Sequence, residues 1–573
     1  MNKIPCLSLL VLAALVGCSR RPEAVNAAPV SAAATAAAAS VTAEDLASRI
    51  RTLSDDRFGG RGPATTGDVA ARQWIASELK GLGLEPGGAD GGYEQPFDIV
   101  GIDARMPALW RFGAGGKVLE LARREDYVAV AGKQAPTGGF KDAEVVFVGY
   151  GIQAPEFQWD DFKGVDLKGK VLLMLNNDPD WDDALFAGKT RLYYGRWDYK
   201  YESAARQGAA GAIIIHTVPS AGYPFQVLQT SNSGEQFELP AGDEPRTEVN
   251  AWVTEAKARE LVAFAGKDLG KLVESARSRD FRPVSLGVRT SLAYTAKVAR
   301  KSTANVAGLL RGSDPALSSQ VVVYTAHHDH LGTGEPDAKG DRIYNGAIDN
   351  AAGVAQVLAV AKAYRALPTP PRRSILFLLV AAEEQGLLGS KWYAAHPTFA
   401  PGRIAADFNV DGGNVLGRAL DVQFIGMGKS SLDAVVGRYA AHQGRVLKPD
   451  QMPDRGFYYR SDQFALAKIG VPAFFAEQSL DFKGRPAGWG KAQVEDYEEH
   501  RYHQPSDEFD PAWNYDGMLE DVRLLFWSGL EVANGDAMPA WNAGDEFEAA
   551  RKAALAEAGG LSGSADSPAN TGR

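Results

Sequence analysis

The residues best suited to metal chemistry stand where apolar runs of the sequence end. Three such ends are His327-His328-Asp329-His330 after the run 321–326, Glu383-Glu384 after 374–382, and Asp411 after 404–410. Apolar runs of this length are typical of buried strands. Because the carboxyl ends of parallel strands meet at one edge of a sheet, we expect these imidazoles and carboxylates to converge. The adjacent carboxylates of Glu383 and Glu384 repel one another, so they need a cation or a proton between them.

Two further residues extend this set. Asp349 precedes a stretch of helical spacing that includes Val354 and Leu358, and His503 lies in the polar segment 502–507. Taken alone, Asp349 could equally cap that helix, and a single histidine is more often a structural residue. Taken together, the imidazoles and carboxylates form a ligand set for a divalent metal that needs no sulfur.

The composition excludes several other kinds of chemistry. The only cysteines, Cys6 and Cys18, stand at the N-terminal end, so no cysteine-ligated metal site or cysteine nucleophile is available beyond residue 18. The sequence also has no G-x-S-x-G elbow and no phosphate-binding G-x-x-x-x-G-K-[ST] loop. A formal net charge of −10 argues against a nucleic-acid partner.

The elements that must position the ligands follow from the pattern of apolar residues. From about residue 303 to 534, strands alternate with helices, which predicts an α/β fold with a mixed, mostly parallel sheet flanked by helices. Short apolar strands between polar loops over 140–289 indicate an inserted β-rich module. A capping box at 42–45 marks the start of the ordered chain, and a helix is expected over 66–82.

The two ends of the chain have a different character. Residues 1–18 combine a basic start with a short apolar run, which is typical of a signal peptide, and Leu15-Val16-Gly17-Cys18 resembles a bacterial lipobox. We therefore expect a lipid anchor on Cys18 as the only membrane contact, and a place in the bacterial cell envelope, as an outer-membrane lipoprotein or a periplasmic or secreted protein. Residues 19–41 and 541–573 are rich in small residues, which predicts a disordered tether and a disordered tail.

The spacing of these motifs resembles that of the M28 metallopeptidases, which are co-catalytic zinc enzymes and mostly aminopeptidases. The motifs are Ala326-His327-x-Asp329, Gly346-x-x-Asp349-Asn350-x-x-Gly353, Glu383-Glu384-x-Gly386-x-x-Gly389-Ser390, Asp411 and Tyr502-His503. The resemblance also takes in Gly60-Arg61-Gly62, so the peptidase domain is expected over 42–139 and 290–540. The insert at 140–289 resembles a protease-associated domain in segments 170–174 and 209–214.

The resemblance implies two zinc ions per chain and a role for each matched residue. Asp349 would bridge the two ions, His327 and Asp411 would complete one site, and Glu384 and His503 would complete the other. Glu383 would act as the general base, and Asp329 would accept a hydrogen bond from His327. Tyr502 and Tyr458 are both candidates for assisting the oxyanion. His328, His330 and His500 match no ligand position, and Gln463 stands where the family often has histidine.

The leading functional prediction is an aminopeptidase that acts on peptides through a water activated by two zinc ions. A carboxypeptidase or dipeptidase, or an enzyme like the glutaminyl cyclases, could use the same fold. A binding protein that pairs this fold with the insert is a further alternative, but such a protein should lack ligands that this chain has.

Overall fold

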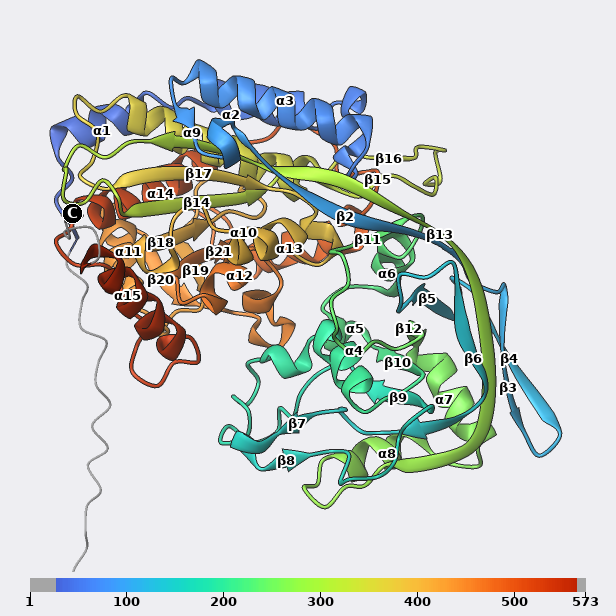
Figure 1. Ribbon diagram of the computed structural model, residues 1–573. Coiled ribbons are helices and arrows are strands. Elements are labelled where there is room, and N and C mark those ends of the chain that lie inside the picture. The colour runs from blue at the N-terminus through green and yellow to red at the C-terminus, as the bar shows by residue number, and fades with distance from the viewer. Residues whose placement is uncertain (1–26, 564–573) are drawn as a thin grey trace, which may run out of the picture.

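Two lobes joined by two long strands make up the protein (Figure 1). The computed structural model describes residues 27–563, so the predicted signal peptide and Cys18 lie outside the described residues. The connecting strands are β2 (Glu94–Arg105) and β13 (Val284–Leu310), which pair with each other in antiparallel register. In the lower lobe of Figure 1, side chains of β13 alternate between buried and exposed, whereas its last eight residues, in the upper lobe, are all buried.

The sheet of the upper lobe is mixed and has parallel strands at its centre. Next to β13 come β17 (Ser374–Val380), β14 (Val321–His327), β18 (Ile404–Asn409) and β21 (Ala473–Glu477), all parallel to one another, and then β19 (Asp421–Ile425) and β20 (Val446–Pro449). The short strand β1 (Glu85–Pro86) pairs with β13 on the side away from β17. The mixed, mostly parallel sheet expected from the sequence is confirmed.

Helices cover both faces of this sheet, and the strand sequences explain why. Alternate side chains of β14 enter different cores: Val322 and Tyr324 pack on one face, and Val321 and Val323 on the other. Because both faces are buried, each central strand is apolar throughout. The first face carries α1 (Ala32–Ala39), α2 (Ala43–Leu53), α3 (Thr66–Gly81), α9 (Gly353–Arg365), α11 (Leu432–His442) and α14 (Asp516–Asn534). The second face carries α10 (Leu388–Ala395) and α12 (Gln463–Lys468).

Predictions about local elements have mixed outcomes. The capping box is confirmed, because the Thr42 hydroxyl accepts from the Asp45 N–H and the Asp45 carboxylate accepts from the Thr42 N–H. Helix α3 matches the helix expected over 66–82. The tether prediction is wrong for the described residues that form α1, where Ala34, Ala37 and Ala38 are buried against the first core. Alanine has the highest helix propensity, and its small side chain lets this helix pack closely.

The C-terminal segment also differs from its prediction. Within the range 541–573, which was expected to be disordered, α15 (Glu548–Gly563) is helical. Phe547 just before this helix is buried among aromatic residues, and the buried Arg551 guanidinium donates to the carbonyl of Ile404. Tertiary contacts therefore order a segment whose composition alone suggests a tail.

The lower lobe has its own sheet and its own core. Strands β6 (Thr137–Phe147), β9 (Val171–Leu175), β10 (Gly211–His216) and β12 (Val249–Thr254) run parallel, and β5 (Tyr127–Ala131) pairs antiparallel with β12. The hairpin of β3 (Leu109–Ala114) and β4 (Lys117–Ala122) projects from this lobe. The remaining strands are β7 (Gln153–Ala154), β8 (Trp159–Asp160) and β11 (Gln236–Glu238), and the helices are α4 (Trp197–Arg206), α5 (Val218–Ala221), α6 (Phe225–Ser231), α7 (Glu255–Phe264) and α8 (Leu269–Ala276).

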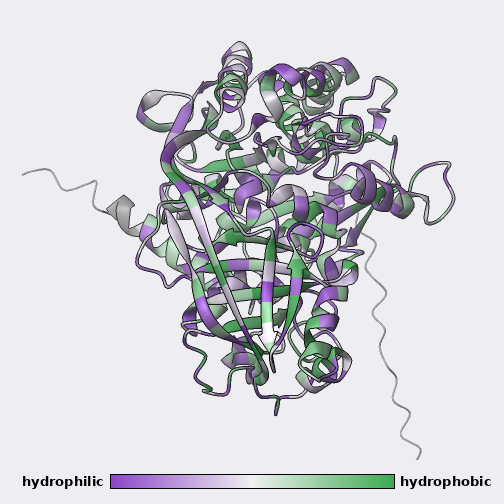
Figure 2. Cartoon of the chain, turned by 90° about the vertical axis from the view of Figure 1, so that its right-hand side faces the viewer, coloured by the Kyte–Doolittle hydropathy of each residue, from purple (hydrophilic) through white to green (hydrophobic). Residues whose placement is uncertain are grey.

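Residues before position 140 share the core of the lower lobe, since Trp110, Phe112 and Tyr127 are buried in it. The boundaries of the insert at 140 and 289, and its likeness to a protease-associated domain, stay predictions. Figure 2 shows apolar residues gathered on the strands and polar residues on the outer loops and helix surfaces. Among residues 27–563, no helix is long and apolar enough to cross a membrane.

Candidate metal centre

All five predicted ligands meet at the carboxyl edge of the upper sheet. His327 is the last residue of β14, Glu384 lies in the turn 383–385 just after β17, and Asp411 follows β18. Asp349 comes from the π-helical turn Ala347–Ala352 that leads into α9, and His503 from the loop after α13 (Trp489–His500). The convergence predicted from the strand ends is therefore present.

Asp349 stands at the centre of this group. Its Oδ1 lies 3.2 Å from His327 Nε2, and its Oδ2 lies 3.4 Å from His503 Nε2. His327 Nε2 is also 3.2 Å from Asp411 Oδ1, and His503 Nε2 is 3.1 Å from Glu384 Oε2. The two oxygens of the Asp349 carboxylate thus face two separate pairs of predicted ligands, His327 with Asp411 and His503 with Glu384. A ligand that bridges two metal ions requires this arrangement.

The backbone around Asp349 is held by residues on other segments. The Asp507 carboxylate accepts from the N–H groups of Ile348 and Asp349. Asn350 Oδ1 accepts from the N–H groups of Gly353 and Gly412, which ties the turn to the strand end that carries Asp411. Gly346 has φ +56°, and a Cβ there would lie 2.1 Å from the Asp349 carbonyl oxygen. Asp507 had no predicted role, although it lies in the same segment as His503.

The fully buried Arg61 forms hydrogen bonds with the same turn and with neighbouring loops. Its guanidinium donates to the carbonyls of Leu53, His328, Asn345 and Gly346. Burial lowers the pKa of Arg61 to about 10, although carboxylates of the site oppose this shift, so the guanidinium keeps its charge at neutral pH. The Gly60-Arg61-Gly62 motif therefore supports the loops that carry His327 and Asp349.

Glu383 and Asp329 differ in how far they meet their predictions. Glu383 Oε2 lies 4.0 Å from His327 Nε2, beside the ligands. The predicted hydrogen bond from His327 to the Asp329 carboxylate is absent, because the separation from His327 Nδ1 is 3.7 Å. The Asp329 carboxylate instead accepts from the N–H groups of Glu383 and Glu384. Its role is to shape the turn that presents both glutamates.

The other three histidines have distinct surroundings. His330 Nδ1 lies 2.6 Å from Glu384 Oε1, so His330 contacts a ligand. His328 is buried, with Nε2 3.2 Å from the Ala304 carbonyl, whereas the His500 side chain is 60% exposed. Sequence reasoning did not single out the contact between His330 and Glu384, because nothing in the spacing of the two residues indicates it.

The two candidate tyrosines are separated by the fold. Tyr502 lines the cavity beside the ligands, and its hydroxyl accepts from Arg460 Nη2 at 3.2 Å. Tyr458 packs in an aromatic core with Tyr459 and Phe547, outside the set of cavity-lining residues. The prediction for Tyr458 is therefore wrong, because packing against Tyr459 and Phe547 places its ring in that core.

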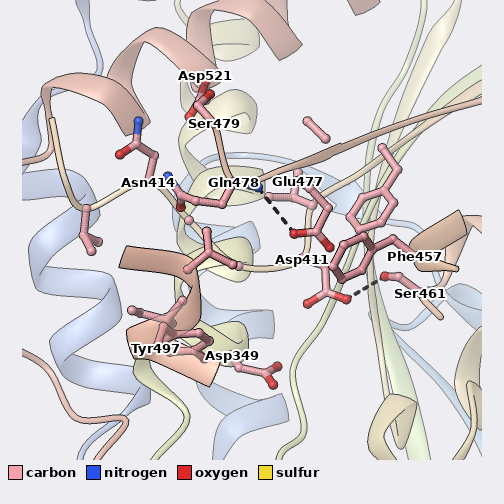
Figure 3. Close-up of a pocket in the computed structure, with 18 of the residues that line it drawn as sticks. Asp349, Asp411, Asn414, Phe457, Ser461, Glu477, Gln478, Ser479, Tyr497 and Asp521 are labelled. Atoms are coloured by element: carbon pink, nitrogen blue, oxygen red, sulfur yellow. Dashed lines mark hydrogen bonds between the residues drawn. The ribbon is translucent and has the colours of Figure 1, made fainter. Parts of the chain in front are cut away.

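Gln463 occupies an interior position rather than the edge of the cavity. Its amide accepts from Asn409, which also donates to Ser461, and Ser461 Oγ donates to Asp411 Oδ2 at 2.7 Å (Figure 3). The departure from the family pattern at this position thus supports Asp411 through a chain of hydrogen bonds.

A cavity of about 360 Å³ opens next to the ligands. Its walls include Tyr223 from the lower lobe and Phe457, Arg460 and Glu477 from the upper lobe. Figure 3 shows the carboxylates of Glu477 and Asp411 close together on one wall. Burial raises the pKa of Glu477 to about 8, and the neighbouring Asp411 adds to this rise.

The electrostatics of the site divide the acids into two groups. Burial opposes ionisation of Asp349, but contacts with His327 and His503 hold its pKa well below the usual range. Burial and the charge of Asp349 likewise oppose ionisation of Glu384, and His503 and His330 outweigh them, lowering its pKa to about 2. Burial raises the pKa of Glu383 well above its usual range, helped by Glu384 and Asp411. Asp349 and Glu384 are therefore ionised, whereas Glu383 is able to hold a proton.

The donor set fits zinc. Ligand atoms of His327, Asp349 and Asp411 lie within 4.8 Å of one another, as do those of His330, Asp349 and Glu384. Imidazole nitrogens and carboxylate oxygens without thiolate suit zinc and other borderline divalent ions. The fold and this ligand set fit a zinc metallopeptidase.

Sequence comparison finds a match to a known family. Residues 305–526, which are less than half of the chain, match the model of peptidase family M28. A vacuolar membrane protease of Clavispora lusitaniae is 31% identical over 116 residues, which is 20% of this chain. The match spans only 10% of that curated relative.

The chain is also similar to solved structures, and the first of them supports the fold. An aminopeptidase from Aneurinibacillus sp. strain AM-1 aligns over 87% of this chain and 96% of its own, with 20% identity and a TM-score of 0.51. A zinc aminopeptidase from Bacillus subtilis aligns over 87% of this chain and 96% of its own, with 17% identity and a TM-score of 0.46.

Proposed function

We propose that the protein is an aminopeptidase that removes N-terminal residues from peptides with two bound zinc ions. The observation that carries this proposal is Asp349, whose two oxygens face His327 and His503 separately. His327 and Asp411 would hold one ion, Glu384 and His503 the other, and Asp349 would serve both. When bound, the ions polarise the scissile carbonyl and lower the pKa of a water molecule.

Two side chains of this protein supply the remaining chemistry. Glu383, with its raised pKa, takes a proton from the attacking water and passes it to the leaving amine. Tyr502 accepts a hydrogen bond from Arg460, which leaves its own hydroxyl hydrogen free to donate toward the carbonyl oxygen of the substrate. Neither step needs a covalent intermediate.

The acids on the cavity wall favour a substrate with a free N-terminus. Glu477 and Asp411 lie beside the ligands, where they would attract the ammonium group of a peptide. Burial raises the pKa of Glu477 to about 8 although the charge of Arg460 opposes this shift, so a substrate ammonium group beside Glu477 would further stabilise its carboxylate.

One observation favours a second function, a carboxypeptidase or dipeptidase. Arg460 lines the same cavity, lies over the rings of Tyr223 and Phe457, and could pair with a substrate carboxylate. In the proposed aminopeptidase, Arg460 already has a role, because it donates a hydrogen bond to Tyr502. Substrates that differ only at their termini separate the two functions.

The test uses peptides of one sequence with a free or acetylated N-terminus and a free or amidated C-terminus. We expect cleavage of the free-amine peptides whatever the C-terminus, and loss of cleavage with chelator. Glu383→Gln should keep about two zinc ions per chain while kcat falls about 10²- to 10⁴-fold. Glu477→Gln should raise KM, whereas the exposed control Glu495→Gln should not. Equal cleavage of acetylated peptides would refute the aminopeptidase, and a need for the free carboxylate would favour the second function.

We further propose that the protein is lipidated at Cys18 and resides in the bacterial cell envelope. The lipobox-like segment 15–18 supports this proposal. Cys18→Ser should move the protein from the membrane fraction to the soluble fraction, whereas Cys6→Ser should not. A wild-type protein without lipid on Cys18 by mass spectrometry would contradict it.

A further inference from the structure

Among the described residues, two hydrogen bonds join the lower lobe to the loops of the metal centre. At the end of α6, Ser231 Oγ lies 2.8 Å from His503 Nδ1. In β11, the Phe237 N–H donates to Gln385 Oε1 at 2.9 Å, and Gln385 directly follows Glu384. Both contacts lie in the segment 231–237, outside the part of the chain that matches the M28 family model.

The nitrogen atoms of His503 have separate partners. Nε2 faces Glu384 and Asp349, so it is the nitrogen available to a metal. A metal-binding nitrogen must keep its lone pair, so in the neutral ring the proton sits on Nδ1. Ser231 Oγ is then the acceptor for this proton, and the hydrogen bond sets both the tautomer and the orientation of the ring.

Within residues 27–563, the ligands His327 and Asp411 have no hydrogen bond to the lower lobe. His327 Nδ1 lies 3.3 Å from the Asp329 carbonyl, and Asp411 accepts from Ser461. Both partners belong to the upper lobe. Among the described residues, the lower lobe therefore contacts His503 and the residue that follows Glu384, whereas the hydrogen-bond partners of His327 and Asp411 belong to the upper lobe.

We propose that Ser231 is a positioning residue of the lower lobe that sets the zinc affinity of the site formed by Glu384 and His503, and not that of the site formed by His327 and Asp411. The proposal rests on the two-zinc function above. It makes the lower lobe a structural part of one metal site, so a displacement of this lobe would change one zinc affinity and not the other.

Zinc binding to the full-length protein tests this proposal. Metal-free protein is titrated with zinc against a chromophoric chelator, which gives an affinity for each of the two ions. Ser231→Ala should weaken one site about 10- to 100-fold and leave the other within about 2-fold, the range expected when the hydrogen-bond partner of a metal ligand is lost. Ser231→Thr keeps the hydroxyl and should restore the affinity.

A matched control lies two residues away. The Ser233 hydroxyl donates to the Thr230 carbonyl within the same segment, so Ser233→Ala should leave both affinities unchanged. Unchanged affinities in Ser231→Ala, an equal loss at both sites, or no rescue by threonine would each overturn the proposal. A wild-type protein that binds fewer than two zinc ions would refute the proposed function and this inference with it. The other three outcomes, in a wild-type protein that binds two ions, would refute this inference alone.

Discussion

Arg61→Met should strongly destabilise the folded protein. Arg61 lies far in sequence from residues 305–526, which match the family model, yet its guanidinium is completely buried beneath the loops that carry His327 and Asp349. It donates to the carbonyls of Leu53, His328, Asn345 and Gly346. Methionine has a similar length and no donor, so the substitution removes the hydrogen bonds and keeps most of the packing volume.

The expected loss of stability follows from the carbonyl groups that lose their hydrogen-bond donor. Each buried carbonyl without a donor costs about 1–3 kcal/mol. The Gly346 carbonyl also accepts from the Ala351 N–H, so the other three carbonyls set a lower bound of about 3 kcal/mol. Removing the buried charge returns part of its desolvation cost, but breaking a buried charged network by removing one partner still costs about 3–5 kcal/mol. We therefore expect a loss of about 4 kcal/mol in the free energy of unfolding.

Urea unfolding of metal-free Arg61→Met, followed by fluorescence and circular dichroism, measures this loss. Arg57→Met is the matched control, because the Arg57 side chain lies in the same short turn and is 62% exposed. It should change the free energy of unfolding by less than about 0.5 kcal/mol. A loss below about 1 kcal/mol in Arg61→Met would refute the reasoning, since the carbonyls of Leu53, His328 and Asn345 would then have other donors.

Three further changes have defined outcomes. Asp349→Ala should lower zinc content at both sites when measured by mass spectrometry, because its two oxygens face both ligand pairs; two ions still bound would contradict the bridging role. Tyr502→Phe should reduce kcat about 10²-fold with little change in KM, and an unchanged kcat would exclude its hydroxyl from the reaction. Burial lowers the pKa of His328 to about 3, so below pH ~6.5 only the unfolded chain takes up its proton and stability falls. Between pH 7 and 5 the metal-free wild type should lose about 2 kcal/mol that His328→Gln keeps, and equal losses in urea unfolding would refute this.

Much of the fold and of the ligand set could be predicted from the sequence. The apolar runs before His327, Glu383 and Asp411 specify buried parallel strands, and parallel strands bring their carboxyl ends to one edge. The capping box at Thr42 is similarly local, since its two hydrogen bonds join residues three positions apart. Such features depend on short-range patterns that one segment carries by itself.

Other features arise only when distant segments pack together. The helix α1 is ordered by the core it covers, and Tyr458 enters an aromatic cluster with Phe547 instead of the cavity. The contact between Ser231 and His503 joins residues 272 positions apart, and the bond from Arg61 to Gly346 joins residues 285 apart.

The sequence by itself determined which residues could bind a metal and which strand ends would present them. Only the tertiary structure decided which side chains hold those ligands in place. The physical reason is that ligand types and strand periodicity depend on residues close together in the sequence. A buried hydrogen bond instead depends on the burial and approach of both partners. For Arg61, Asp329 and Ser231, those partners are supplied by segments remote in the chain.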